Sequence, residues 1–266
     1  MSTIPITAGR QSRLAMAVAD TVSVAGRNLA NLWRTPQALI FATIQPVMFV
    51  LLFRYAFGGA IHVPGVAYVD YLMPGIFAQS VAFGGIGTAV GLSADMASGI
   101  FTRFRTLPMS RVAVLTGRTA ADLVRNLVVV AVMTGVGYAV GFRAHTGAAG
   151  LLGALGLVAV FAYAASWGFV ALGLAVSDPE AAQGAGVPVV FVLVFSSAAF
   201  VPLSTMPGWL QAFGAHQPVT ALVDAERALI AGGPAAGHVL ACLAWSAGML
   251  VVFAGLATRA YRRISR

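Results

Sequence analysis

Residues 71–94, YLMPGIFAQSVAFGGIGTAVGLSA, contain no charged side chain. An α-helix rises about 1.5 Å per residue, so this run is long enough to cross the roughly 30 Å hydrocarbon core of a bilayer. The rest of the chain has the same character, because 59% of the 266 residues are hydrophobic and only 9% are charged. Soluble domains carry about 25% charged residues. The fold class predicted from this stretch is therefore an all-α polytopic membrane protein.

Apolar runs elsewhere in the chain predict five further membrane-spanning helices, which makes six in all. In order, the predicted spans are 37–57, 71–94, 122–142, 150–176, 185–201 and 239–260. Six spans of about 20 residues use about 120 residues. The remainder is too short to add a separate soluble catalytic domain to the loops and interfacial pieces.

The segment 202–237, before the last span, is divided by proline into pieces too short to span. We expect these pieces to be re-entrant half-helices at the outer surface, around Trp209 and residues 221–230, because proline interrupts a helix and short apolar pieces cannot cross the bilayer. The alternative is that Trp209 simply anchors a loop in the outer leaflet.

The basic residues predict the orientation. All 16 are arginine, and with the N-terminus inside, 13 of them, Arg125 included, face the cytoplasm while only Arg54, Arg143 and Arg227 face out. Cytoplasmic loops carry such an excess of positive charge. We therefore expect both termini in the cytoplasm and assign the net charge of +8 to topology rather than to nucleic-acid binding. Arginine-only basicity also suggests a high-GC bacterium, and hence the bacterial plasma (inner) membrane.

Residues 1–36 are predicted to be a cytoplasmic tail that ends in an amphipathic helix, and residues 37–266 the transmembrane domain. Between residues 14 and 34, apolar residues recur every three or four positions and polar residues fill the opposite face. With Trp33 near its end, this helix suits the cytoplasmic headgroup layer. The alternative is a helix packed on a soluble partner.

Several kinds of site are missing from the sequence. It contains no G-x-x-x-x-G-K-[ST] phosphate loop and no H-E-x-x-H or paired Cys/His set. No predicted span has a carboxylate at its centre, where ion-driven carriers generally keep one. We therefore expect no catalytic residue, bound cofactor or metal site, and a source of energy outside this chain. A membrane scaffold without a translocation path stays open, and an ion-coupled carrier is disfavoured.

Two motifs resemble the permeases of type-2 ATP-binding-cassette exporters. The predicted cytoplasmic loop 95–118 contains GIFTRFRTLPMSR at 99–111, similar to that family's G-x-x-x-R-[FL]-R-x-x-P-[MV]-x-R signature. VPLSTMPGWL at 201–210 and HQPVT at 216–220 are similar to its element before the last span. The motifs occur in the family's order, and the resemblance covers essentially the whole chain. It is similar in particular to the daunorubicin-resistance branch, although Asp95 stands where many relatives carry a Glu nearer the glycine.

The resemblance implies a permease subunit of an ATP-driven exporter. It implies two copies of an ATPase subunit, which would bind ATP and magnesium, a second permease that is identical or homologous, and an amphiphilic substrate such as a drug or a lipid. The expected ATPase-coupling residues are Phe101, Arg103, Phe104, Arg105, Leu107, Pro108, Met109 and Arg111. The alternative for this loop is a solvated segment that only sets topology.

Three further sets of residues follow from the resemblance. Arg27, Trp33 and Arg34 would belong to a connecting helix that touches the ATPase, and Pro207, Trp209 and Pro218 to the re-entrant region that caps the pathway. The second and fifth spans would line the substrate path through Phe77, Gln79, Ser80, Phe83, Phe191, Phe195, Ser196 and Ser197. Aromatic rings with a few hydroxyls and amides suit an amphiphile, although phenylalanines at helical spacing also pack against lipid. The glycines between 84 and 91 predict a close helix seam.

Overall fold

The computed structural model describes residues 26, 36–59, 61, 63, 65–98, 111–176 and 178–264, and over these residues it is helical without a strand. The helices are α2 (Pro36–Leu51), continued by a π-helix (Leu52–Phe57), α3 (Tyr68–Ala97), α5 (Arg111–Ala139), α6 (Gly147–Ala175), α7 (Pro179–Phe195), a 3₁₀ turn (Leu203–Thr205), α8 (Gly208–Ala215), α9 (Pro218–Ala231) and α10 (Ala235–Ile264). The predicted all-α fold is confirmed for this part of the chain.

Four of the described helices are long and apolar enough to cross a membrane: α3, α5 from Leu115, α6, and α10 as far as Tyr261. Two shorter apolar helices, Ala42–Phe57 and Pro179–Phe195, run beside them. Large apolar side chains are exposed on α2, α7 and α10, as expected where lipid is the solvent. The chain is therefore a multi-pass membrane protein.

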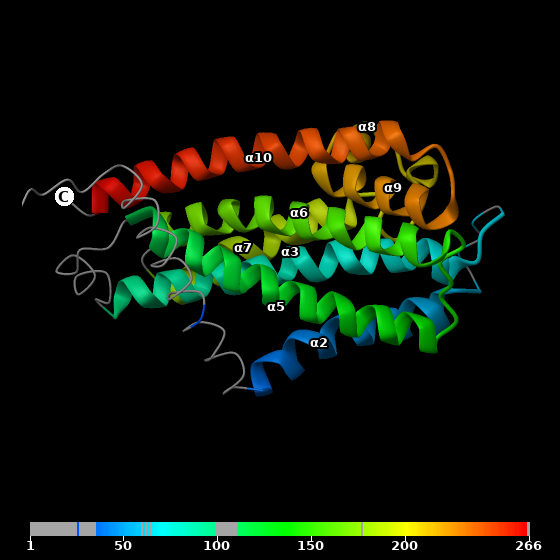
Figure 1. Cartoon of the computed structure of the whole chain (residues 1–266), viewed down its shortest axis with the longest axis horizontal. Coiled ribbons are helices and arrows are strands. Elements are labelled where there is room, and N and C mark those ends of the chain that lie inside the picture. Colours follow the sequence, from blue (N-terminus) through cyan, green and yellow to red (C-terminus); the bar gives the residue numbers. More distant parts are fainter. Residues whose placement is uncertain are drawn as a thin grey trace, which may run out of the picture.

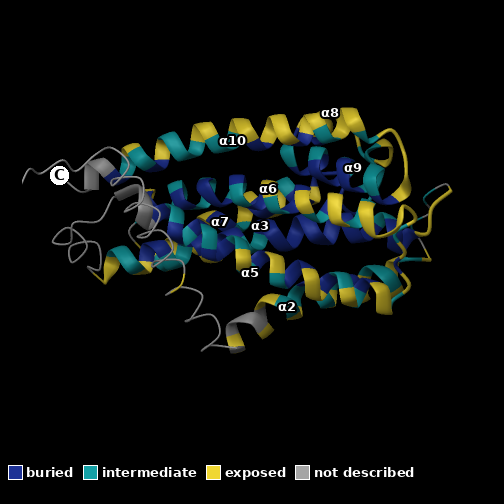
Figure 2. Cartoon of the chain, viewed as in Figure 1, coloured by how far each residue is buried: buried dark blue, intermediate teal, exposed yellow. Residues whose placement is uncertain are grey.

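Helix α3, which contains the uncharged run, lies at the centre of the bundle. It packs against α2, α5, α6, α7 and α9 and is buried over most of its length, whereas α10 is largely exposed (Figure 2). At Gly75 a Cβ atom would lie 2.9 Å from the backbone Cα of Ala199. At Gly173 of α6 it would lie 2.7 Å from the carbonyl oxygen of Ala89. Glycine thus lets backbone approach α3 closely on two sides.

The long helices lie side by side along one axis, and short helices cap one end (Figure 1). The start of α2 and the end of α10 lie at the same end of the bundle as Ala97 and Arg111, which flank the segment 99–110. Helices α8 and α9 lie at the opposite end. We call these the inner and outer ends.

Two predicted spans have the wrong bounds. The third was expected to begin at Asp122, but α5 begins at Arg111, because no proline interrupts the chain between Pro108 and the apolar run. The fifth was expected over 185–201, but α7 begins at Pro179, where the Asp178 carboxylate accepts from the Ala181 N–H at 2.9 Å. Such a cap followed by proline is a typical helix start.

The proline-rich segment before α10 forms short helices, as predicted. Trp209 lies in α8, and residues 221–230 lie in α9, which starts at Pro218. Helix α9 ends at Gly232, whose φ of 86° is in the left-handed region that glycine adopts without strain. Neither helix is long enough to span a bilayer.

Candidate functional site

A cavity of about 530 Å³ opens among α2, α3, α5 and α7, and we call it the inner cavity. Its apolar lining is Ala42, Pro46, Phe83, Gly84, Ile86, Gly87, Val90, Val129 and Val187, and its polar lining is Gln45, Ser80, Arg125, Asn126 and Gln183. A mostly apolar wall with a few convergent polar groups is the usual composition of a small-molecule site. The polar groups come from all four helices.

Arg125 is the charged residue of this lining. Its Nη2 donates to the carbonyl oxygen of Gly84 at 2.7 Å, and its Nη1 lies 3.3 Å from Oδ1 of Asp122, one turn earlier on α5. The sequence led us to count Arg125 among the cytoplasmic arginines, but the structure places it within a helix and not in a loop. Because α5 starts at Arg111, Arg125 is the middle residue of the helix.

The glycines of α3 make room for side chains of α5. A Cβ at Gly84 would collide with the amide of Asn126, and one at Gly91 would collide with the guanidinium of Arg118. Arg118 in turn forms an ion pair with Asp95 near the inner end of α3. The glycines thus mark a packed contact between α3 and α5, as predicted. What occupies the space beside them is long polar side chains of α5 and not its backbone. The Asp95–Arg118 pair joins α3 to α5 on either side of residues 99–110.

An aromatic cluster extends from the inner cavity toward the outer end. The ring of Phe83 meets that of Phe191 edge-on at 5.5 Å, and Phe191 stacks on Phe195 at 5.1 Å. Phe195 continues to Phe200 at 5.2 Å, and Phe200 stacks on Phe53 of the π-helix at 4.6 Å. Rings from α3, α7, the turn after α7 and the π-helix that continues α2 thus form a continuous apolar track beside the cavity.

The structure brings only some of the predicted path residues together. Ser80 and Phe83 line the inner cavity, and Phe191 and Phe195 are partly exposed members of the aromatic cluster. Phe77 is buried in the core, and Gln79 is buried without a hydrogen-bond partner for its amide among the described residues.

Ser196 and Ser197 were expected on the fifth span, but they follow the end of α7. Their hydroxyls donate to the carbonyl oxygens of Val192 and Val194, which helps to end the helix at Phe195 because hydroxyls that bond nearby carbonyls compete with helical hydrogen bonds.

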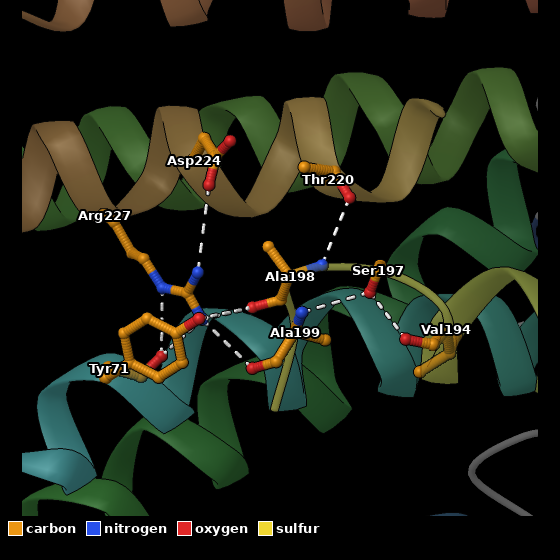
Figure 3. A network of polar contacts seen from close by, with 8 residues as sticks. All are labelled: Tyr71, Val194, Ser197, Ala198, Ala199, Thr220, Asp224 and Arg227. Carbon is orange, nitrogen blue, oxygen red and sulfur yellow. Dashed lines mark hydrogen bonds and ion pairs between the residues drawn. The ribbon is translucent and has the colours of Figure 1, made fainter. Parts of the chain in front are cut away.

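The turn after α7 is non-helical backbone buried in the bundle, and side chains satisfy it (Figure 3). The Ala198 N–H donates to the hydroxyl of Thr220 at 3.2 Å, and the Ala199 N–H donates to the hydroxyl of Ser197 at 3.1 Å. The Tyr71 hydroxyl donates to the carbonyl oxygen of Ala198 at 3.0 Å. Irregular backbone at membrane depth is tolerated only where protein satisfies it in this way.

Arg227 of α9 is at the centre of this outer network. Its Nη2 donates to the carbonyl oxygens of Ala198 at 2.7 Å, Ala199 at 3.1 Å and Tyr71 at 2.9 Å. Its guanidinium also lies over the Tyr71 ring, 3.4 Å from the centroid. The sequence identified Arg227 only as one of three outward arginines. The available signal was a single arginine in a half-helix that is otherwise mostly apolar.

Glu226, next to Arg227, is a second residue that the sequence interpretation missed. Its side chain is fully buried, and neither carboxylate oxygen has a hydrogen-bond partner among the described residues. Burial raises the pKa of the Glu226 carboxyl well above its usual value, and the charge of Arg227 opposes this only in part. Helix α9 lies outside the candidate spans, so a search of the spans for carboxylates could not find this residue. The expectation that no span has a central carboxylate is itself wrong at Asp122, which is buried within the candidate span Leu115–Ala139.

The remaining predicted residues are placed as follows. Arg27, Trp33, Arg34 and the coupling residues from Phe101 to Met109 lie outside the described residues, and Arg111 is the first residue of α5. Pro207 precedes α8, Trp209 projects from it with 75% exposure, and Pro218 begins α9. The ATPase-coupling role and the connecting helix therefore stay predictions.

A second cavity, of about 550 Å³, lies between α5, α6 and α10 and has an almost entirely apolar wall. Its lining includes Leu123, Tyr163 and Leu250, and none of the described residues that line it is charged. We call it the lateral groove. Since lipid chains and helix faces are equally apolar, it carries no sign of selective recognition.

Comparison with known proteins places this architecture in a family. The chain is 36% identical over 257 residues to the daunorubicin resistance ABC transporter permease protein DrrB1 of Streptomyces coeruleorubidus, which covers 97% of this chain and 91% of the relative. It is 29% identical over 258 residues to the probable doxorubicin resistance ABC transporter permease protein DrrC of Mycobacterium tuberculosis. That alignment covers 97% of this chain and 93% of the relative. Residues 20–230 match the ABC-2 type transporter family model. The chain belongs to the ABC-2 type transporter family, which confirms the resemblance found in its sequence motifs.

Proposed function

We propose that this ABC-2 permease is the membrane half of an ATP-driven exporter that moves a drug, a lipid or another amphiphile out of the cytoplasm or the inner leaflet. The inner cavity carries the proposal. Its volume of about 530 Å³ is within the range of small-molecule sites, and its walls combine apolar surface with a few polar groups. Two relatives are named as daunorubicin and doxorubicin resistance permeases, which favours a planar or lipid-like substrate.

The proposed topology is six spans with both termini in the cytoplasm of a bacterial cell. The arginine excess at one side of the chain supports it. The arrangement of the helices supports it as well, because the start of α2 and the end of α10 lie at the same end of the bundle (Figure 1), as an even number of spans requires.

The energy comes from two copies of a separate ATPase subunit, which bind ATP and magnesium, and the permease pairs with a second, identical or homologous permease. This chain is then a non-catalytic subunit. Residues 99–111 transmit the motion of the ATPase, with phenylalanines as anchors and arginines for a complementary surface. The ion pair between Asp95 and Arg118 supports this role, because it ties α3 and α5 together where they leave that segment.

Helices α8 and α9 form the exit side. Arg227 holds α9 against the turn after α7 and against α3, so a movement of α3 and α7 is passed to the outer end. Helices of this length cannot span the bilayer, and in this proposal they form the re-entrant cap of the pathway.

The test is co-purification. This chain is expressed with a tag, together with the ATPase encoded beside it, as the unaltered chain, as Arg103→Glu with Phe104→Ala, and as Arg259→Gln. Arg259 is an exposed arginine of α10, so its substitution is the matched control. We expect the ATPase to co-purify with the unaltered chain and the control, and the 103/104 variant to lose export of a fluorescent amphiphile.

Two results would overturn the proposal. If no ATPase co-purifies and the 103/104 variant exports normally, the energy does not come from such a subunit. If deletion of the chain leaves drug tolerance and lipid export unchanged, the chain is a scaffold without a translocation path.

A further inference from the structure

We infer that the inner cavity recognises the head group of its substrate by donating hydrogen bonds from Arg125, so that it prefers amphiphiles whose head carries anionic acceptor oxygens over those with a cationic head. The ligand chemistry is a carboxylate or a phosphate ester attached to an apolar body. The inference rests on the proposed function and names the substrate class.

Arg125 is the only charged residue among the described residues that line the inner cavity. The other polar groups of this lining, Gln45, Ser80, Asn126 and Gln183, are neutral. The hydroxyl hydrogen of Ser80 is already used, since it donates to the carbonyl oxygen of Ile76 at 2.7 Å. The described lining thus presents one cation, amide groups and no carboxylate to a ligand.

Arg125 has more N–H donors than its contacts within the described residues use. A guanidinium carries five N–H groups in a fixed fork. Among the described residues, Arg125 makes one hydrogen bond to the carbonyl oxygen of Gly84 and an ion pair with Asp122, so further N–H groups are available to a ligand. Asp122 is not among the residues that line the cavity. Charge-assisted, bidentate recognition of carboxylate and phosphate is the chemistry for which arginine is best suited.

Arg125 lies near the middle of the candidate span Leu115–Ala139 of α5. The carbonyl oxygen that it contacts, that of Gly84, is near the middle of α3, Tyr68–Ala97. A charged side chain at such a position in a span is costly and marks a functional site by default. Topology setting does not explain this position, because the loop arginines at 103–111 already supply the inward charge.

Apolar surface continues from the inner cavity along the aromatic cluster. Phe83 lines the cavity and meets Phe191, which stacks on Phe195. An amphiphile can therefore place its head at Arg125 and its apolar body along the aromatic cluster. The lateral groove between α5, α6 and α10 offers no such polar end.

The experiment compares probes that differ only in the head group. The purified full chain in nanodiscs is titrated with three dansyl-labelled twelve-carbon chains that end in a carboxylate, a phosphate monoester or a trimethylammonium group. We expect the two anionic probes to bind at least about tenfold more tightly than the cation, as one charge-assisted hydrogen-bonded contact implies. Arg125→Gln should bring the three affinities to within about twofold, and Arg259→Gln should leave the preference intact.

A measurement on the unaltered chain guards against misfolding of the variant. A carboxylate probe with a diazirine beside its head is photolysed and the labelled peptides are identified. Label on 80–90 of α3 and 125–129 of α5 supports the inference. Label confined to the lateral groove or to α10 overturns it, as does a trimethylammonium probe that binds as well as the carboxylate. If only one of the two anionic probes binds more tightly than the cation, the inference stands, and the result identifies the anionic head group as a carboxylate or as a phosphate ester.

These outcomes are separate from those of the proposed function. If Arg125→Gln loses the head-group preference while the ATPase still co-purifies, the result supports both the export proposal and the head-group inference. If no ATPase co-purifies with the unaltered chain, the export proposal fails even when the preference is measured. If export is ATP-driven but indifferent to the head group, the inference alone fails.

Discussion

Replacing Arg227 with methionine tests the clamp that joins α9 to the turn after α7. The substitution keeps an unbranched apolar stem of similar reach but removes every donor. It takes hydrogen bonds away from the carbonyl oxygens of Tyr71, Ala198 and Ala199, and it removes the cation–π contact with the Tyr71 ring. Ala198 keeps a donor, the Tyr71 hydroxyl, whereas Arg227 is the only donor to the carbonyl oxygen of Ala199 among the described residues.

The magnitude follows from these contacts. A buried carbonyl left without a donor costs about 1–3 kcal/mol, and a desolvated cation–π contact contributes up to about 2 kcal/mol. Removing the guanidinium also ends the cost of burying it, which lowers the sum. We expect Arg227→Met to reduce the free energy of unfolding by about 2–4 kcal/mol. For a chain of this size that is a drop in Tm of roughly 4–16 °C.

The assay is thermal unfolding of the detergent-solubilised chain, followed by tryptophan fluorescence, with Asp224→Asn as the matched control. Asp224 lies 3.8 Å from the guanidinium, and its side chain is 37% exposed. Such an ion pair contributes about 0–1 kcal/mol, so the control should lower Tm by only a few degrees. Equal losses for the two variants would show that the ion pair holds α9, and the carbonyl clamp would be refuted.

Three further predictions use other parts of the structure. Burial raises the pKa of Glu226 in the folded state, whereas the unfolded chain releases that proton above about pH 4.3. The free energy of unfolding should therefore fall from pH 5 to pH 8. Glu226→Gln should flatten the profile of Tm against pH. Gly75→Ala places a Cβ against the Ala199 backbone and should cost about 1–3 kcal/mol, whereas Gly156→Ala, which meets open space, should not lower Tm. Asp95→Asn removes the ion pair with Arg118; it should leave ATP hydrolysis by the co-purified ATPase unchanged but lower transport per ATP by roughly 2- to 30-fold, as about 0.5–2 kcal/mol of coupling energy implies.

The lengths of the uncharged runs predicted the helix bounds well where no capping residue or proline moves the start of the helix. The uncharged run 71–94 became α3, Tyr68–Ala97, with an error of three residues at each end. The fifth span was placed six residues too late, because residues 177–184 were left between two predicted spans as a connection. Asp178 and Pro179 are instead a helix cap and a first helical residue.

The site was harder to predict, because it depends on which helices are neighbours. The glycines of α3 correctly indicated close approach, but sequence does not say that Arg118 and Arg125 of α5 would fill the space. Arg125 itself was counted as a topology signal, since a charge near the start of an apolar run usually is one. Arg227 and Glu226 belong to a half-helix whose burial comes from packing against α3, α6, α8, α10 and the turn after α7.

The central claim is that this chain forms an export path driven by ATP hydrolysis on another subunit. It is tested most directly by the uptake of a fluorescent amphiphile into inside-out vesicles that contain the chain and its ATPase. The account predicts uptake that needs ATP, that persists when the proton gradient is collapsed, and that is absent when either subunit is omitted. Uptake that continues without ATP under a proton gradient, or that the ATPase does not affect, would contradict it.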